Sequence, residues 1–246
     1  YSAFTYFCGF KVNSGEYKLM GLAPYGEPIY ADKIFEHLVD LKEDGSMAMD
    51  MSYFNYCQGL TMTGPKFDEL FDGPPRKSES PISQREMDLA ASIQAVTEKV
   101  VLAMAKEAKR LTGSKNLCLA GGVALNCVAN GKLLRSEIFE NVFVTPASGD
   151  AGGALGAALF LHFHLLKSER KVDGIHDSAQ GSLLGPKYEN SEVRAFFDGE
   201  KIKYNYFEKE EDLLRATAGE MADQKIIGWF HGRMEWGPRA LGNRSI

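Results

Sequence analysis

Hydrophobic residues recur at helical spacing over one long segment, which is the clearest pattern in the chain. Residues 83–86 (SQRE) have the form of a capping box, in which serine and glutamate side chains bond to backbone groups at a helix start. Apolar residues then recur every three or four positions as far as Leu111, and Gly113 is a typical stop. The pattern predicts a helix of about 29 residues, roughly 43 Å long at 1.5 Å per residue.

Short segments of alternating type follow this helix. Residues 116–120 (NLCLA) predict a buried strand, residues 124–136 a helix, residues 142–145 (VFVT) a second strand and residues 150–167 an apolar helix. Glycine-rich turns separate each strand from the next helix. This βαβα order predicts an α/β fold with a parallel sheet and covering helices. The apolar window at 151–166 is shorter than the about 20 residues of a membrane span, so we expect a core helix of a soluble protein.

The remaining segments have weaker patterns. Residues 1–12 are aromatic and β-prone, which predicts a strand ending near Gly9. Residues 13–28 contain several glycines and prolines and predict a shaped loop that can include one helical turn. The other expected elements are helices over 29–40, 189–198 and 209–223, and strands over 202–207 and 226–230.

Composition narrows the class of protein. The 246 residues include 28 Lys+Arg and 33 Asp+Glu, a net charge of −5, with 44% hydrophobic residues, as in ordinary globular proteins. Without a basic cluster we expect no nucleic-acid partner, and we expect no membrane partner. The four cysteines form no CxxC pair, which favours free thiols in the cytoplasm. Because the chain starts without Met inside an apolar run, we expect a piece of a longer protein.

Two strand-to-helix turns are candidates for ligand binding. The first, residues 120–126 (AGGVALN), joins a glycine pair to a helix start, whose free N–H groups favour a phosphate. The second, residues 148–156 (SGDAGGALG), places Asp150 where a strand ends, suited to a metal ion or a nucleotide. The alternatives are a tight turn at the first and an N-cap at Asp150. Consecutive turns of this kind would line one crevice.

Two further segments carry candidate polar groups. Glu16 and Lys18, in the Gly/Pro loop, are suited to bonding a ribose or sugar hydroxyl, although a surface ion pair is the alternative. Near the C-terminus, Arg233, Arg239 and Arg244 alternate with glycines, which favours an anion site over a solvated basic loop. The five histidines offer no complete metal shell, and the sequence has no Ser-His-Asp set or Walker loop.

Taken together, four segments resemble one family. GEYKLMGLAPYG, AGGVALNCVANGKL, SGDAGGALGAAL and GRMEWGPRALGNRSI are similar to the signature segments of NodU/CmcH-type O-carbamoyltransferases and stand in that family's order. The resemblance extends over the whole chain and is weakest over about residues 40–80 and 168–225. Any one segment alone would be weak evidence, whereas four in order are specific.

The resemblance implies an ATP-dependent enzyme. Such enzymes move a carbamoyl group from carbamoyl phosphate, through a carbamoyl-adenylate, to a hydroxyl of a sugar or natural product. It also implies an actin-like ATPase (ASKHA, ribonuclease H-like) lobe with a parallel or mixed sheet, followed by a YrdC-like α/β domain. The expected division is a partial actin-like domain over 1–170, a linker over 171–200 and a truncated YrdC-like start over 201–246. A homodimer is one oligomeric state that we consider.

The resemblance also assigns residues. Asp150 would match the family's metal-ligating aspartate, for one divalent ion expected to be iron. The residues expected at the nucleotide are Gly121, Gly122, Val123, Asn126, Ser148, Gly149 and Gly152, with Glu16 and Lys18 near the ribose or acceptor. Arg239, Asn243 and Arg244 would help to hold carbamoyl phosphate. The family's histidine ligands lie in an HxxxH-like element that is absent here, so we expect the chain alone to be inactive.

Two alternatives remain open. One is a sugar kinase of the actin-like superfamily, which would use ATP and an acceptor without carbamoyl phosphate. The other is a nucleotide-binding module without turnover. The acceptor and the general base cannot be identified from the residues.

Overall fold

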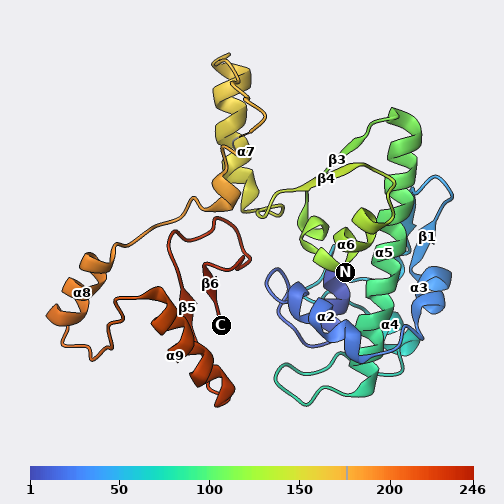
Figure 1. The fold of residues 1–246 in the computed structure, drawn as a ribbon. Helices are drawn as coiled ribbons and strands as arrows, with labels where there is room; N and C mark the ends of the chain where they lie inside the picture. Colours follow the sequence, from blue (N-terminus) through green and yellow to red (C-terminus); the bar gives the residue numbers. More distant parts are fainter. Residues whose placement is uncertain (176) are drawn as a thin grey trace. The chain divides into compact units, whose positions relative to one another are not determined.

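The chain folds into two compact units in a computed structural model that describes residues 1–175 and 177–246. Unit 1 comprises Tyr1–Leu119 and Asn126–Phe143, and unit 2 comprises Ala120–Leu125 and Val144–Ile246. Their helices and strands are labelled in Figure 1. The expected domain boundaries at residues 170 and 200 stay predictions. No helix among the described residues is long and apolar enough to cross a membrane.

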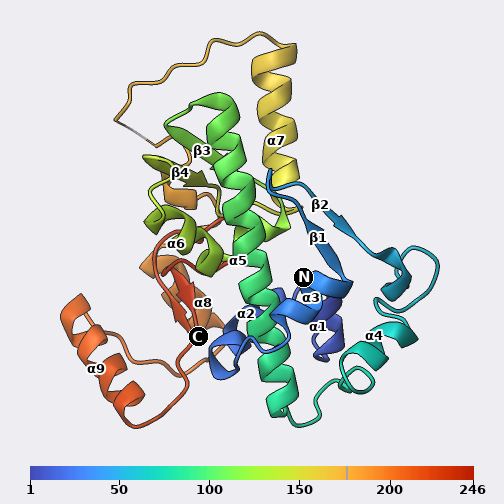
Figure 2. The same ribbon diagram turned by 90° about the vertical axis from the view of Figure 1, so that its right-hand side faces the viewer.

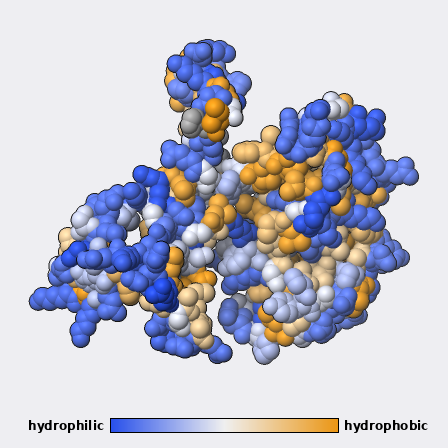
Figure 3. Space-filling view, in the orientation of Figure 1, coloured by the Kyte–Doolittle hydropathy of each residue, from blue (hydrophilic) through white to orange (hydrophobic). Residues whose placement is uncertain are grey.

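Unit 1 is built mainly of helices. Its helices are α1 (Ser2–Phe7), α2 (Glu16–Leu22), α3 (Ala31–His37), α4 (Pro65–Leu70), α5 (Gln84–Thr112) and α6 (Cys127–Arg135), with single 3₁₀ turns at Ala23–Tyr25 and Met51–Tyr53. Strands β1 (Val39–Leu41) and β2 (Met47–Met49) form an antiparallel hairpin, and β3 (Asn116–Leu119) pairs with β4 (Asn141–Val144). Figure 3 shows hydrophobic side chains at the surface where β3 and β4 lie. Phe143 of β4 is 64% exposed.

The long helix α5 confirms the strongest sequence prediction. Its capping box forms, with the Ser83 backbone N–H donating to the Glu86 carboxylate at 2.9 Å, and Gly113 ends it with a φ of +63°. Figure 2 shows α5 from end to end, with α2 and α3 beside its N-terminal half. That half is buried at Leu89, Ala90 and Ile93, whereas later turns are more exposed. Unit 1 is therefore assembled around the first half of α5.

The predicted strand over residues 1–12 is wrong, because Ser2–Phe7 form helix α1. Phe4 and Phe7 are three residues apart and both pack against Phe67, with ring centroids at 5.1 Å and 4.8 Å. Residues three apart share one face of a helix but lie on opposite faces of a strand. The shared aromatic partner therefore requires the helix, and long-range packing overrides the local β-propensity.

The expected loop over residues 13–28 is also more regular than predicted. It contains α2 and the 3₁₀ turn, and both pack against α5. Gly26 lies so close to the α5 backbone that an added Cβ would stand 2.1 Å from the carbonyl carbon of Met87. Glycine is needed there because no side chain fits between the two backbones.

Unit 2 has little buried apolar surface. It contains α7 (Gly152–Phe160), continued by a π-helical turn at Leu161–Leu165, α8 (Asn190–Gly199), α9 (Glu210–Ala222) and the antiparallel pair β5 (Trp229–Phe230) and β6 (Arg244–Ser245). Short 3₁₀ helices lie at Gly122–Leu125 and Gln180–Ser182. Ala124 and Ala147 are the buried hydrophobic residues of this unit among those described.

The α/β class is confirmed by the mixture of helices and strands, but several predictions about the second half of the chain fail. The apolar helix is present as α7, but none of its residues is buried, so the expected core helix is wrong: the described residues of unit 2 provide too little apolar surface to cover it. In place of one covered parallel or mixed sheet, the described residues form three two-stranded sheets. The predicted strand over 202–207 is absent there, and the one over 226–230 is reduced to β5. The predicted neighbours β3 and β4 do pair.

The close approach at Gly26 gives a first prediction. Gly26→Ala should lower the free energy of unfolding by about 1–3 kcal/mol, because the methyl group forces the 3₁₀ turn away from α5. Gly21→Ala in α2 is the matched control, since a Cβ there would meet nothing within 4 Å and alanine favours a helix. Urea unfolding measures both. Equal stability of the two variants would contradict the close packing.

Candidate functional site

The two glycine-rich turns contact each other, as the sequence predicted. The Gly121 N–H donates to the Ser148 carbonyl oxygen at 2.9 Å. A Cβ on Gly149 would stand 3.5 Å from Leu125, and one on Gly152 only 2.0 Å from the Ala147 carbonyl oxygen. Residues 120–125 and the whole second turn belong to unit 2, whereas Asn126 belongs to unit 1. The residues expected to line one crevice are therefore adjacent.

The two glycines of the first turn differ in whether the backbone requires glycine at that position. Gly121 has a φ of +97°, a conformation that side chains disfavour. Gly122 has no positive φ, and a Cβ there would meet nothing within 4 Å. Nothing within the described structure requires glycine at position 122. The space beside Gly122 leaves room for a ligand, and the predicted role of this residue at a nucleotide stays a prediction. Val123, which follows, is 50% exposed.

In the second turn, the side chains of Asp150 and Ser148 differ in availability. Asp150 is exposed, and its carboxylate makes no hydrogen bond or ion pair with the described residues. It does not cap α7, whose N-cap is Ala151. Ser148 is buried, and its hydroxyl donates to the Thr145 carbonyl. Asp150 is thus the side chain of this turn that is available to a ligand.

A metal ion would need more ligands than Asp150. Among the described residues, no group of three or more His, Cys, Asp or Glu side chains lies close enough to hold a metal. A carboxylate is a suitable ligand for a divalent cation, but one carboxylate does not complete a coordination shell. The residues described here therefore fit a metal only in part, with Asp150 as a single ligand.

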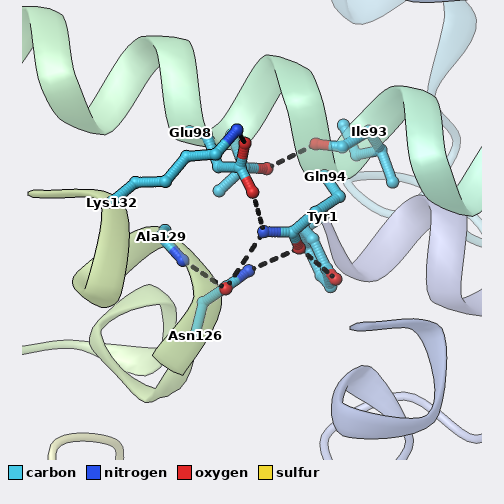
Figure 4. Close-up of polar contacts among 8 residues, drawn as sticks. Tyr1, Ile93, Gln94, Glu98, Asn126, Ala129 and Lys132 are labelled. Atoms are coloured by element: carbon cyan, nitrogen blue, oxygen red, sulfur yellow. Dashed lines mark hydrogen bonds and ion pairs between the residues drawn. The ribbon is translucent and has the colours of Figure 1, made fainter. Parts of the chain in front are cut away.

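Asn126, at the end of the first turn, has its side chain occupied by protein groups (Figure 4). Its Nδ2 donates to Gln94 Oε1 at 2.8 Å, and its Oδ1 accepts from Gln94 Nε2 at 3.2 Å and from the Ala129 backbone N–H at 3.0 Å. Asn126 is 8% exposed and is the N-cap of α6. These hydrogen bonds hold α6 against α5. Because its polar atoms already have protein partners, Asn126 would affect a ligand by positioning the neighbouring backbone.

Sequence reasoning missed the partners of Asn126 on α5. Gln94 also donates to Glu98 Oε1 at 2.9 Å and accepts from the Tyr1 hydroxyl at 3.1 Å (Figure 4). The side chain of Glu98 is 7% exposed and forms an ion pair with Lys132 of α6. The sequence indicated this network only by two polar residues four apart on one helix face, in a half-helix that also buries Glu86, Asp88 and Ser92. Buried polar groups need partners, and these find them across unit 1.

Glu16 and Lys18 do not form a joint site. They lie in α2, and residues two apart on a helix point about 200° apart. The Glu16 carboxylate accepts from the Ser2 hydroxyl and the Asn13 N–H, each at 2.9 Å, and Lys18 is exposed. The predicted loop position is wrong, and their predicted role near a ribose or acceptor stays a prediction.

The C-terminal arginine segment is organised by Glu235, a residue that the sequence did not single out. Glu235 is 2% exposed, and its Oε1 accepts the backbone N–H groups of Leu241 at 2.9 Å and Asn243 at 2.8 Å. Arg244 Nε lies 3.5 Å from its Oε2. In the sequence, the role of Glu235 was indicated by its being a single acidic residue among three arginines. This carboxylate closes the loop between residues 235 and 244.

The predicted anion-binding side chains of this loop are partly used within it. The Arg244 guanidinium donates to the Gly237 carbonyl and, at 3.3 Å, to the Arg239 carbonyl. The Asn243 amide donates to the Arg233 carbonyl at 2.9 Å. Arg239 is half-buried. Arg244 and Asn243 therefore shape the loop that carries Arg239.

The pKa of Glu235 lies below its ordinary value. Burial alone would raise the pKa, but the N–H groups of Asn243 and Leu241 and the Arg244 guanidinium favour the charged form more strongly. The ionised carboxylate is thus the form that holds the loop.

Comparisons with known proteins match the chain at both ends. A family model described as the carbamoyltransferase N-terminus matches residues 1–159, and one described as the carbamoyltransferase C-terminus matches residues 218–246. The first covers more than half of the chain and includes both glycine turns and Asp150.

Similar proteins are longer than this chain. An uncharacterized protein of Synechocystis is 57% identical over the whole chain, which covers 40% of that protein. Nodulation protein NolNO of Sinorhizobium fredii is 39% identical over 94% of the chain and 32% of its own length. Nodulation protein NolO of Bradyrhizobium diazoefficiens is 37% identical over 94% of the chain and 39% of its own length. The chain thus spans two fifths or less of these relatives.

The Gln94–Asn126 pair gives a prediction about stability. Gln94→Ala and Asn126→Ala should each cost about 1–3 kcal/mol, because each leaves a buried polar partner unsatisfied. The double variant should cost less than the sum, with a coupling of about 0.5–3 kcal/mol in a double-mutant cycle measured by urea unfolding. Gln58→Ala removes the same groups from an exposed position and should change little. Additive costs would refute the pairing.

Glu235 gives a prediction about pH. Because its pKa is lower in the folded chain than its ordinary 4.5, ionised Glu235 stabilises the fold above that pH, and this contribution is lost as pH falls through the lowered pKa. Glu235→Gln cannot ionise and should lack this part of the acid destabilisation. Trp229 and Trp236, both in unit 2, report the unfolding by fluorescence. Identical pH profiles for the two proteins below pH 4.5 would contradict the assignment.

Proposed function

We propose that this chain, which belongs to the carbamoyltransferase family, is part of an enzyme that transfers a carbamoyl group from carbamoyl phosphate to a hydroxyl of a sugar or natural product. One observation carries the proposal. The Gly121–Ser148 bond joins two glycine turns that present an open backbone at Gly122 and an unpaired carboxylate at Asp150. A transfer site needs both an approachable backbone and a free polar group.

ATP is the nucleotide that we assign to these turns. A Cβ at Gly121 or Gly122 would meet nothing within 4 Å, and the 3₁₀ helix that begins at Gly122 would offer its first N–H groups to a phosphate. In the proposed reaction carbamoyl phosphate and ATP form a carbamoyl-adenylate, with release of phosphate and pyrophosphate. The acceptor hydroxyl then attacks the carbamoyl carbon, loses its proton to a base and displaces AMP. N–H groups at the turn would bind the phosphate of AMP and stabilise the oxyanion that forms as the acceptor hydroxyl attacks.

Asp150 is the residue that we assign to a divalent metal ion, expected to be iron. Its exposed, unpaired carboxylate supplies one ligand, and the remaining ligands would come from outside the described residues. A bound ion of this kind supplies Lewis-acid polarisation of a carbonyl oxygen. The first of the two turns also contains Val123, and the second also contains Gly149 and Gly152.

Carbamoyl phosphate is assigned to the loop that Glu235 closes. Arg239 is carried on this loop, and a guanidinium matches the geometry of a phosphate. Asn243 and Arg244 hold the loop in place through bonds to backbone carbonyls. We expect the reaction in the cytoplasm, since all four cysteines are free thiols.

The test uses the full-length protein with ATP, carbamoyl phosphate and a panel of hydroxyl acceptors. Gly122→Ala should lower kcat/KM by about tenfold or more while leaving stability unchanged, because its methyl group meets only the ligand. Gly219→Ala in α9 is the matched control, since its Cβ also meets nothing within 4 Å. Asp150→Ala should lower kcat by roughly 100-fold or more.

Three outcomes would contradict the proposal. Acceptor modification without carbamoyl phosphate would indicate a kinase. Nucleotide binding by calorimetry without any product would indicate a module that only binds. Full activity of Gly122→Ala and Asp150→Ala would remove the two turns from the site.

A further inference from the structure

We propose that unit 1 carries a second binding site, for a small molecule with several phosphate charges, in a groove beside α5. The groove has a volume of about 560 Å³, within the range of ligand pockets. Residues of β1, α5 and α6 and of the turn after β1 line it, and Figure 1 shows α5 between β1 and α6. The groove lies wholly within unit 1, so this site is independent of the proposed transfer reaction.

One face of α5 forms the wall of the groove. The residues of this face are Ala95, Glu98, Lys99, Leu102, Ala103 and Lys106. They recur every three or four positions, so their side chains lie in one stripe. Lys99 and Lys106 are two helical turns apart, about 10 Å along the axis at 1.5 Å per residue. The sequence pattern of α5 thus sets two ammonium groups in line along the groove.

The groove is basic although the chain is acidic. Lys42, Lys99, Lys106 and Lys132 line it with two acids, Glu43 and Glu98, which leaves a net charge of 4 − 2 = +2. The whole chain has a net charge of −5. A concave surface with a local excess of one charge attracts counter-ions of the opposite sign.

Two of the four lysines are available to a ligand. Lys132 neutralises the buried Glu98, and Lys42 lies 2.5 Å from Asp40. Lys99 holds its ammonium 4.5 Å from the centre of the Phe35 ring, which orients the group but leaves its charge uncompensated. Lys106 is exposed and has no ion-pair partner among the described residues. With Lys132 and Lys42 paired, Lys99 and Lys106 stand against one remaining acid of the lining, Glu43, so the local net charge including Asp40 is 2 − 1 = +1.

The spacing and the lining define the ligand chemistry. Lysine ammonium groups bind phosphate as point charges. Two of them about 10 Å apart along a helix exceed the reach of one phosphate and favour a chain of phosphates or two separated phosphates. Leu41, Ala95, Leu102 and Ala103 add apolar surface to the same groove. The ligand class is a small polyphosphate or bisphosphate, with or without an apolar part.

The experiment titrates the full-length protein with inorganic phosphate, pyrophosphate and tripolyphosphate by calorimetry. Affinity should rise with chain length, because a longer chain reaches both lysines. The double variant Lys99→Gln/Lys106→Gln should weaken tripolyphosphate binding at least about fivefold, with its circular dichroism unchanged. Lys77→Gln is the control: it removes one positive charge from an exposed position of unit 1 outside the groove and should bind normally.

Either of two results would overturn the proposal. Absence of tripolyphosphate binding at about 1 mM would exclude a site of useful affinity. An equal loss in the Lys77→Gln protein would indicate attraction by overall charge alone. Carbamoyl transfer by the double variant should equal that of the unaltered protein, so failure of this site and failure of the proposed function are distinguishable.

Discussion

Burial of the first half of α5 is the constraint on which unit 1 depends. Leu89, Ala90 and Ile93 are covered by the surrounding short helices, none of which is long enough to be stable without that contact. The same packing brings the Gly26 backbone against Met87, where no side chain could fit. One long amphipathic helix therefore provides the surface that makes its smaller neighbours helical.

The polar residues of α5 extend this role to α6 within unit 1. Gln94 pairs with Asn126, the residue that ends the first glycine turn and begins α6. A buried amide pair has few alternative partners, so it specifies register as well as adding stability. One turn further along, Glu98 neutralises Lys132, and the groove keeps its charge through Lys99 and Lys106.

Unit 2 is organised differently, by local backbone constraints. Its described residues bury almost no large hydrophobic side chain, and α7 is exposed. The two glycine turns are joined by a backbone hydrogen bond, and the arginine loop closes on the Glu235 carboxylate. These are the segments in which the family resemblance is strongest. The conformation of these segments is fixed by the backbone angles of their glycines and by one buried carboxylate, that of Glu235.

Local patterns were enough to predict α5, because a capping box, a helical apolar period and a left-handed glycine all act within the helix itself. They also predicted that the two glycine turns are neighbours, since strands in consecutive units tend to pair. They failed at α1, where Phe67, about 60 residues away, selects a helix, and at Asn126, Gln94 and Glu235, whose roles depend on distant partners. A residue's neighbours in sequence set its backbone preference, but the partners of a buried aromatic ring or polar group are known only once the chain has folded.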